Sequence, residues 1–238
     1  MRAYERFLNY VKIHTTSDEN SNTTPSTRRQ FDLAEILAEE MKKLGVKDVR
    51  VDENCYVYGA IPATLGYEDK PAIGLIAHLD TAPDFCGEHV NPQIHRNYNG
   101  EDVTLGDSGK VLSVKTFPHL KELKGRTLIT TDGTTLLGAD DKAGIAEIMT
   151  VAEELLKGTM SHGKVCIAFT PDEEVGSGAD KMDIPAFGAQ YAYTADGGCE
   201  NEIVYENFNA SEAVFKIRGF NIHPGEARNK MINAALVG

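Results

Sequence analysis

Apolar residues recur at helical spacing in three segments of the chain, 4–11, 31–44 and 142–158. Repeats at intervals of three and four residues place apolar side chains on one face of a helix. Gly45 and Gly158 stand at the ends of the second and third segments, where a glycine commonly ends a helix. The sequence therefore predicts three helices, each with one buried face.

Short apolar runs between these segments predict β-strands, at 49–51, 56–61, 71–77, 164–170 and 189–198. The run KVCIAFT (164–170) contains β-branched and aromatic residues and is bounded by Gly163 and Pro171. This composition is typical of a strand buried on both faces. Because strands and helices alternate, the fold class expected is an α/β sandwich with a mostly parallel central sheet.

Two segments depart from this alternation. Residues 83–124 are polar and irregular and too long for an ordinary connection, which indicates a functional excursion. Residues 203–220 alternate apolar and polar positions as a half-exposed antiparallel ribbon does, and residues 223–238 begin what looks like a helix. We therefore expect one domain over 1–207 and the start of a smaller domain over 208–238, cut short inside its helix.

The charge balance excludes some classes of partner. Thirty-six Asp and Glu residues against 24 Lys and Arg residues give a formal net charge of -12, which repels a nucleic-acid backbone. The first residues carry charges throughout and lack the apolar centre of a signal peptide, and no run is long enough to span a bilayer. The four cysteines show no CxxC spacing. We expect a cytoplasmic protein that binds neither nucleic acid nor membrane.

Acidic residues and one histidine gather where the predicted strands end. The clusters are AHLDT with His78 and Asp80, GADDKAG with Asp140 and Asp141, PDEEVG with Glu173 and Glu174, and TADGG with Asp196. In an open α/β sheet the carboxyl ends of the strands line one crevice, so these residues are expected to converge.

Each cluster also has an ordinary structural explanation. Asp140 or Asp141 would cap a helix, Asp196 would occupy a turn, and His78 would be a hydrogen-bonded core histidine. Four such explanations must then coincide at one edge of one sheet. Burying several carboxylates without a cation would also cost several kcal/mol per unpaired ion, roughly the stability of a whole domain.

Zinc chemistry accounts for the residue types, because zinc binds imidazole nitrogen and carboxylate oxygen and two ions can share a bridging carboxylate. Residues two apart on an extended chain face the same way, so Asp80 can fix the tautomer of His78 while the other ring nitrogen binds metal. Adjacent residues diverge. Glu174 can then reach a metal ion while Glu173 takes the proton of a water as general base.

The motifs HLDTAPD, LGADDKAG, PDEEVGSG and TADGG, in this order, resemble those of the co-catalytic zinc exopeptidases of the M20 family, most closely its tripeptide aminopeptidases. The resemblance implies two zinc ions per full-length subunit and a distinct role for each matched residue. His78 and Asp196 would bind one zinc, Asp140 would bridge both, Glu174 would bind the second, Asp80 would orient His78, and Glu173 would be the general base.

The resemblance also implies a smaller lid and dimerisation domain that interrupts the catalytic domain and would support a homodimer. RGFNIHPGEARNKMINA resembles its opening and places His223 where it would reach a substrate carbonyl or carboxylate, although His223 before Pro224 can also be a helix-start residue. A last metal-binding histidine comes, in that family, from the portion that follows the lid. The second zinc site would then be incomplete in this chain, and the chain itself could be inactive.

The function expected for the intact protein is the removal of the N-terminal residue from short peptides, chiefly tripeptides. Two alternatives remain open at this stage. A related deacylase or carboxypeptidase would use the same two-metal centre on another amide, and a truncated chain would bind metal or peptide without catalysis.

Overall fold

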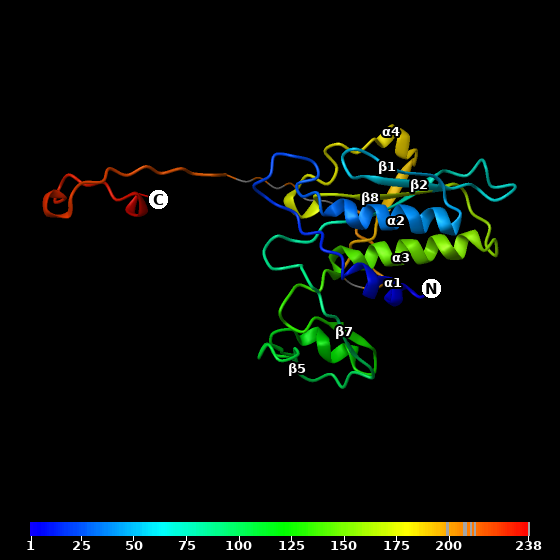
Figure 1. The fold of residues 1–238 in the computed structure, drawn as a ribbon, viewed down its shortest axis with the longest axis horizontal. Helices are drawn as coiled ribbons and strands as arrows, with labels where there is room; N and C mark the ends of the chain where they lie inside the picture. Colours follow the sequence, from blue (N-terminus) through cyan, green and yellow to red (C-terminus); the bar gives the residue numbers. More distant parts are fainter. Residues whose placement is uncertain (199, 207–208, 210, 212, 238) are drawn as a thin grey trace. The chain divides into compact units, whose positions relative to one another are not determined.

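The structure is a computed structural model that describes residues 1–198, 200–206, 209, 211 and 213–237. The chain divides into two units, residues 1–198 and residues 199–238, which Figure 1 draws in the colours of the sequence. The first unit contains all the named helices and strands that surround the strand-end clusters. The second holds His223.

The helices and strands follow the predicted order closely. The α-helices are α1 (Ala3–Tyr10), α2 (Gln30–Leu44), α3 (Ala139–Leu156) and α4 (Ile184–Phe187). The strands are β1 (Lys47–Val51), β2 (Val57–Ile61), β3 (Ile73–His78), β4 (Gln93–His95), β5 (Val103–Thr104), β6 (Val111–Leu112), β7 (Leu128–Thr130), β8 (Val165–Thr170) and β9 (Tyr191–Thr194). Short 3₁₀ helices span Pro118–Leu123, Glu173–Val175, Pro224–Glu226 and Ala234–Leu236.

Five strands form the central sheet, in the order β1-β2-β8-β3-β9. The β8–β3 and β3–β9 pairings are parallel, whereas β1–β2 and β2–β8 are antiparallel. Only β2 runs against the other four strands, so the sheet is mixed and its parallel character lies in β8, β3 and β9. The reason is local, because the short turn from Asp52 to Tyr56 can join β1 and β2 only as a hairpin.

Helices cover one face of this sheet. Side chains of α1, α2 and α3 form one apolar core with the alternate β8 residues Val165, Ile167 and Phe169. Two of the other three β8 residues, Cys166 and Ala168, pack in a smaller cluster that includes Phe187 of α4. All six residues of β8 are buried, which confirms the prediction of a strand covered on both faces.

The long polar segment after β3 folds upon itself. Strand β4 pairs with β7, and β5 pairs with β6, each as an antiparallel two-stranded sheet. A small apolar cluster of Tyr98, Val103 and Leu120 lies within this part. In Figure 1 these elements form the green group that carries the β5 and β7 labels. The segment is therefore a small structured insertion rather than an irregular loop.

The second unit differs from its predicted structure. The described residues of 203–220 form no strand, and the pairing found is a single bridge between Phe220 and Ile232. Residues 207, 208, 210 and 212 of the predicted ribbon lie outside the described residues. In place of the predicted helix, residues 223–237 contain two 3₁₀ turns. Apolar side chains such as Tyr205 and Phe215 are exposed here, so this unit lacks the buried apolar face that stabilises a ribbon or a helix.

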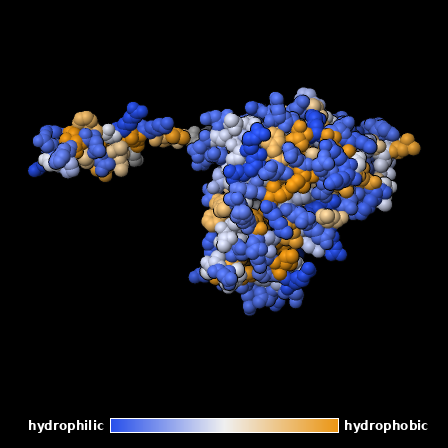
Figure 2. All heavy atoms as spheres, viewed as in Figure 1, coloured by the Kyte–Doolittle hydropathy of each residue, from blue (hydrophilic) through white to orange (hydrophobic). Residues whose placement is uncertain are grey.

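The surface of the first unit is mainly hydrophilic on the face that Figure 2 shows, with apolar residues in scattered patches. This agrees with the acidic composition. Within the part of the chain that the structure describes, no helix combines the length and the apolar character needed to cross a bilayer.

Candidate metal site

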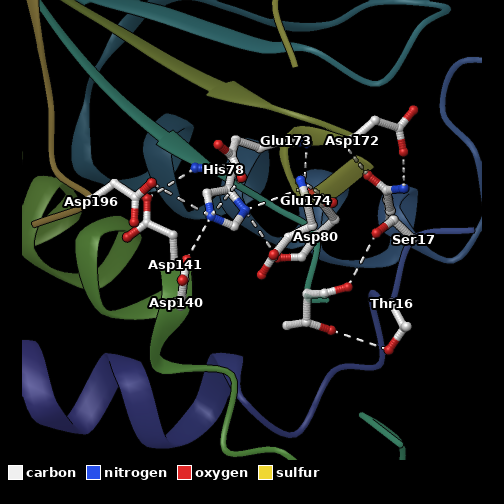
Figure 3. A network of polar contacts seen from close by, with 12 residues as sticks. Thr16, Ser17, His78, Asp80, Asp140, Asp141, Asp172, Glu173, Glu174 and Asp196 are labelled. Atoms are coloured by element: carbon white, nitrogen blue, oxygen red, sulfur yellow. Dashed lines mark hydrogen bonds and ion pairs between the residues drawn. The ribbon is translucent and has the colours of Figure 1, made fainter. Parts of the chain in front are cut away.

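Three neighbouring strands bring the predicted site residues to one edge of the sheet. His78 is the last residue of β3, and it pairs in register with Thr170, the last residue of β8. Asp196 follows β9 on the other side of β3. Because these strands are parallel neighbours, the residues after their ends meet at one edge, where the start of α3 supplies Asp140 (Figure 3).

His78 lies at the centre of this group and is almost fully buried. Its Nδ1 atom is 3.1 Å from the carbonyl oxygen of Asp80 and 3.3 Å from the Oδ1 atom of the same residue. Its Nε2 atom is 2.8 Å from Asp140 Oδ1, 3.9 Å from Glu173 Oε2 and 4.0 Å from Asp196 Oδ2. The Nδ1 atom therefore contacts Asp80, two residues further along the chain, and the Nε2 atom faces several carboxylates.

Two carboxylates, Asp80 and Asp141, which we call the inner carboxylates, are buried and bonded to backbone amides. Asp80 has no exposed surface and accepts hydrogen bonds from the N–H groups of Glu173 (3.0 Å) and Glu174 (3.2 Å). Asp141 accepts hydrogen bonds from the N–H groups of His78 (3.1 Å) and Gly144 (3.2 Å). The bond to Gly144 is the helix-capping arrangement expected for one of the two aspartates.

Gly144 allows the start of α3 to approach the end of β9. A Cβ atom at this position would lie 1.9 Å from the carbonyl oxygen of Ala195 and 2.4 Å from Asp141 Oδ1, which no side chain can tolerate. Gly144, the second glycine of the GADDKAG motif, is thus needed for the close contact that brings Asp140 and Asp196 to the same edge.

The remaining four acids, Asp140, Glu173, Glu174 and Asp196, form a second set that we call the outer carboxylates. Their ligand atoms form two groups with His78, one with Glu173 and Asp196 and one with Asp140 and Glu174, and within each group all atoms lie within 4.8 Å of one another. The side chains of Asp140 and Glu173 are 69% and 51% exposed, so this side of the site is open to solvent.

Burial and mutual repulsion act on the outer carboxylates. Burial raises the pKa of Glu174, and the charge of Asp140 raises it further. The pKa of Asp196 is raised for the same two reasons. Both shifts mean that the ionised acids lack sufficient positive charge nearby, as expected where a cation belongs.

The inner carboxylates, together with Asp140, determine the pKa of His78. Burial alone would lower the pKa of His78, but Asp80, Asp141 and Asp140 together raise it to about 10. Burial raises the pKa of Asp141 to about 8, against the opposing effect of His78. In the metal-free chain a proton on His78 thus supplies positive charge at the place where the acids converge.

The adjacent glutamates both turn toward His78. Glu173 and Glu174 belong to the short 3₁₀ helix Glu173–Val175, and each offers an oxygen to one of the two groups that contain His78. The different roles predicted for them, general base and metal ligand, stay a prediction.

His223 lies in the second unit, exposed, directly before the 3₁₀ turn Pro224–Glu226. Its Nδ1 atom accepts a hydrogen bond from the N–H group of Gly225, which is the helix-start role considered from the sequence. Its predicted role toward substrate stays a prediction.

Several residues that support the site were not identified from the sequence. Ser17 donates its N–H and its hydroxyl to the carbonyl oxygen of Thr81, just after Asp80. Lys142 is buried beside the site and donates to the carbonyl oxygen of Ile13. Asp172 accepts three hydrogen bonds from the segment before α2 and its first residue. Asp172 and Lys142 stand inside the motifs quoted above, whereas no pattern in the polar segment 17–27 indicated that its residues contact the site.

The donor set fits zinc. One imidazole nitrogen and four carboxylates converge at an edge that is open to solvent on one side. The other ring nitrogen of His78, Nδ1, lies within hydrogen-bonding distance of the carbonyl oxygen of Asp80. Imidazole and carboxylate are ligands that zinc accepts, and a hydrogen-bonded second ring nitrogen is the usual support for a metal-binding histidine.

Comparisons with known proteins identify relatives of this chain. The chain is 55% identical over 235 residues to a protein named peptidase T from Desulfitobacterium hafniense, covering 98% of this chain and 57% of that protein. It is 56% identical over 232 residues to a peptidase T from Geobacillus thermodenitrificans, covering 97% of this chain and 56% of that protein. The chain thus spans little more than half the length of these curated relatives. No family profile matches it.

Solved structures share the fold. A tripeptidase from Staphylococcus aureus superposes with a TM-score of 0.58 at 25% identity, over 83% of this chain and 43% of the other. The aminopeptidase PepT from Bacillus cereus superposes with a TM-score of 0.59 at 22% identity, over 99% of this chain and 54% of the other. The resemblance drawn from the four motifs is confirmed: this chain is a homologue of peptidase T over nearly the whole of its own length.

Proposed function

We propose that the chain carries the zinc site of an aminopeptidase that removes the N-terminal residue from tripeptides. The observation that carries the proposal is the convergence of Asp140, Glu173, Glu174 and Asp196 on the Nε2 side of a single buried histidine. Burial and the charge of Asp140 raise the pKa of Glu174 and of Asp196, and a cation would offset both effects. The peptidase T relatives and the tripeptidase neighbour support the choice of reaction and substrate.

The residues that would hold zinc are those named from the motifs. His78 and Asp196 would hold one ion, Asp140 would be shared with a second, and Glu174 would be a ligand of that second ion. When bound, zinc supplies a Lewis acid for the scissile carbonyl and lowers the pKa of a water molecule. Asp80 keeps His78 oriented through the contacts at Nδ1.

Glu173 performs the proton transfers in this proposal. Its carboxylate is half exposed and lies 3.9 Å from His78 Nε2, so it reaches both the ligand cluster and the open side where a peptide would enter. It takes a proton from the attacking water and gives it to the leaving amine, as a general base and then a general acid.

The second unit has a proposed role as well. We assign residues 208–238 to the beginning of a smaller lid domain that contributes to a homodimer, with His223 contacting a carbonyl or carboxylate of the substrate. The support is the likeness of RGFNIHPGEARNKMINA to the opening of that domain.

The activity is tested by the release of free amino acid from an unblocked tripeptide and from its N-acetylated form, with zinc present. For the intact protein we expect cleavage of the free tripeptide only. Glu173→Gln should lower turnover by about 10²-fold or more, because general-base catalysis contributes about 10² to 10⁴, and it should still bind zinc. Tyr10→Phe, which removes one hydrogen bond to Glu40 away from the site, is the matched control.

Each other result points elsewhere. Cleavage of the acetylated peptide would replace the proposal with a deacylase or carboxypeptidase. Zinc binding without cleavage of either peptide would leave a metal-binding chain without catalysis. Loss of zinc together with turnover in Glu173→Gln would contradict the separate roles given to the two glutamates.

A further inference from the structure

Asp172 precedes the glutamate pair and is almost fully buried although it is charged. Its backbone has φ 57° and ψ 28°, the left-handed conformation that Asp and Asn tolerate better than most residues. Its carbonyl oxygen accepts the N–H of Ser177, 2.9 Å away, which closes the turn that contains Glu173 and Glu174. The conformation of Asp172 therefore sets the direction in which both glutamates leave β8.

The carboxylate of Asp172 is held by residues more than 140 positions earlier in the chain. It accepts hydrogen bonds from the N–H of Ser26 (2.7 Å), from the hydroxyl of Ser26 (2.5 Å) and from the side-chain amide of Gln30 (2.7 Å). The N–H of Asp172 in turn donates to Gln30 Oε1 at 3.2 Å. Gln30 is the first residue of α2 and is fully buried, so one of the two residues that hold Asp172 stands on a helix of the core, while Ser26 lies in the segment before it.

The glutamate pair is fixed from two sides as a result. Asp80 accepts the N–H groups of Glu173 and Glu174 from the β3 side, and Asp172 is held from the α2 side (Figure 3). The turn has little room to relax, since a Cβ atom at Gly178 would lie 3.2 Å from the Cα atom of Glu173.

We propose that Asp172, through Gln30 and Ser26, is a positioning residue that holds Glu173 and Glu174 at the zinc site. This inference rests on the proposed zinc site. Residues behind the metal ligands commonly change metal affinity or activity by about 10 to 100-fold when they are replaced. Asp172 sets the direction of the backbone that carries both the ligand Glu174 and the general base Glu173, so it positions both side chains.

Zinc affinity, measured by competition with a chromophoric chelator, tests the proposal without relying on catalysis. The variants are Gln30→Ala, Asp172→Asn and their combination, in this chain. Asn keeps the size of Asp and its tolerance of the left-handed backbone, and Gln30→Ala leaves residues 172–174 unchanged. Tyr10→Phe is the control, because it also removes one hydrogen bond of a buried side chain but touches no residue of the site.

We expect both single variants to bind zinc about tenfold more weakly. Asp172→Asn removes one of the two side-chain oxygen acceptors, and Gln30→Ala removes both bonds between Gln30 and Asp172. The double variant should lose less affinity than the two single losses combined, because both changes weaken the same group of hydrogen bonds. Tyr10→Phe should bind as the wild type does. If Gln30→Ala fails to fold, Ser26→Ala takes its place, since it removes the hydroxyl bond to Asp172, with the bonds that the hydroxyl accepts from Asp18 and Gln30, and keeps the bond from the Ser26 N–H.

Unchanged zinc affinity in the folded variants would overturn the proposal. An equal loss in Tyr10→Phe would also overturn it, because the effect would then be general destabilisation. A wild-type chain that binds no zinc would contradict the proposed function and this inference together. A wild-type chain that binds zinc but cleaves no peptide would contradict the proposed activity alone, and the variant affinities would still decide the role of Asp172.

Discussion

The inner carboxylates, Asp80 and Asp141, and the outer carboxylates, Asp140, Glu173, Glu174 and Asp196, share one edge of the sheet and meet opposite surroundings. Each inner carboxylate is buried and accepts two backbone N–H groups. The outer carboxylates converge on His78 Nε2 at a solvent-open face. The protein supplies backbone hydrogen bonds to the first set, and a bound cation would supply positive charge to the second.

Adjacent acids in the sequence fall on different sides of this division. Asp140 and Asp141 are neighbours, yet Asp141 points to the amides of His78 and Gly144 while Asp140 points to the His78 ring. The comparison teaches that a pair of acids in a motif can combine one structural residue with one that faces the ligand.

Replacing one residue of each set should show the largest effect, which is on stability. Asp80→Ala should lower the free energy of unfolding of the metal-free chain by about 3 kcal/mol, because it leaves two N–H groups and a charged histidine without their partner. Asp140→Asn should change it by less than about 0.5 kcal/mol, because that side chain is exposed and an amide oxygen can still accept from His78. Urea unfolding with a chelator present measures both. Equal losses would remove the distinction between the two sets.

An effect of comparable size is expected from pH on zinc binding at His78. In the metal-free chain the pKa of His78 is raised to about 10, so near pH 7 the ring carries a proton that zinc must displace. Zinc affinity should therefore increase as pH rises from about 6.5 toward 9, by up to roughly tenfold per pH unit for each proton released. Competition titrations at several pH values measure this slope. An affinity that stays constant or falls over this range would place the zinc away from His78.

The sequence was sufficient to predict the convergence of the site residues. His78, Glu173 and Asp196 each follow an apolar strand, and the strands concerned are the parallel ones, so their ends share an edge. Helices α1, α2 and α3 were predicted because each is long enough to show its period, whereas the four-residue α4 was not predicted and the helix expected at 223–238 is not found among the described residues.

Other features depend on contacts that no local pattern records. The hydrogen bond between Asp172 and Gln30 joins residues 142 positions apart. Gln30 also directly follows a polar segment without periodicity. Strands β5 and β6 contain two residues each, too few to show an alternation. The alternating pattern of 203–220 was present in the sequence but forms no ladder among the described residues, because a strand also needs a partner to bond.

The most direct test of the central claim is a calorimetric titration of zinc into the metal-free chain, beside a variant that carries both Asp140→Asn and Asp196→Asn. The wild-type chain should bind at least one zinc ion, and the double variant should bind it at least about 100-fold more weakly. Identical isotherms for the two proteins, or no binding by the wild type, would contradict the assignment of the outer carboxylates to a metal ion.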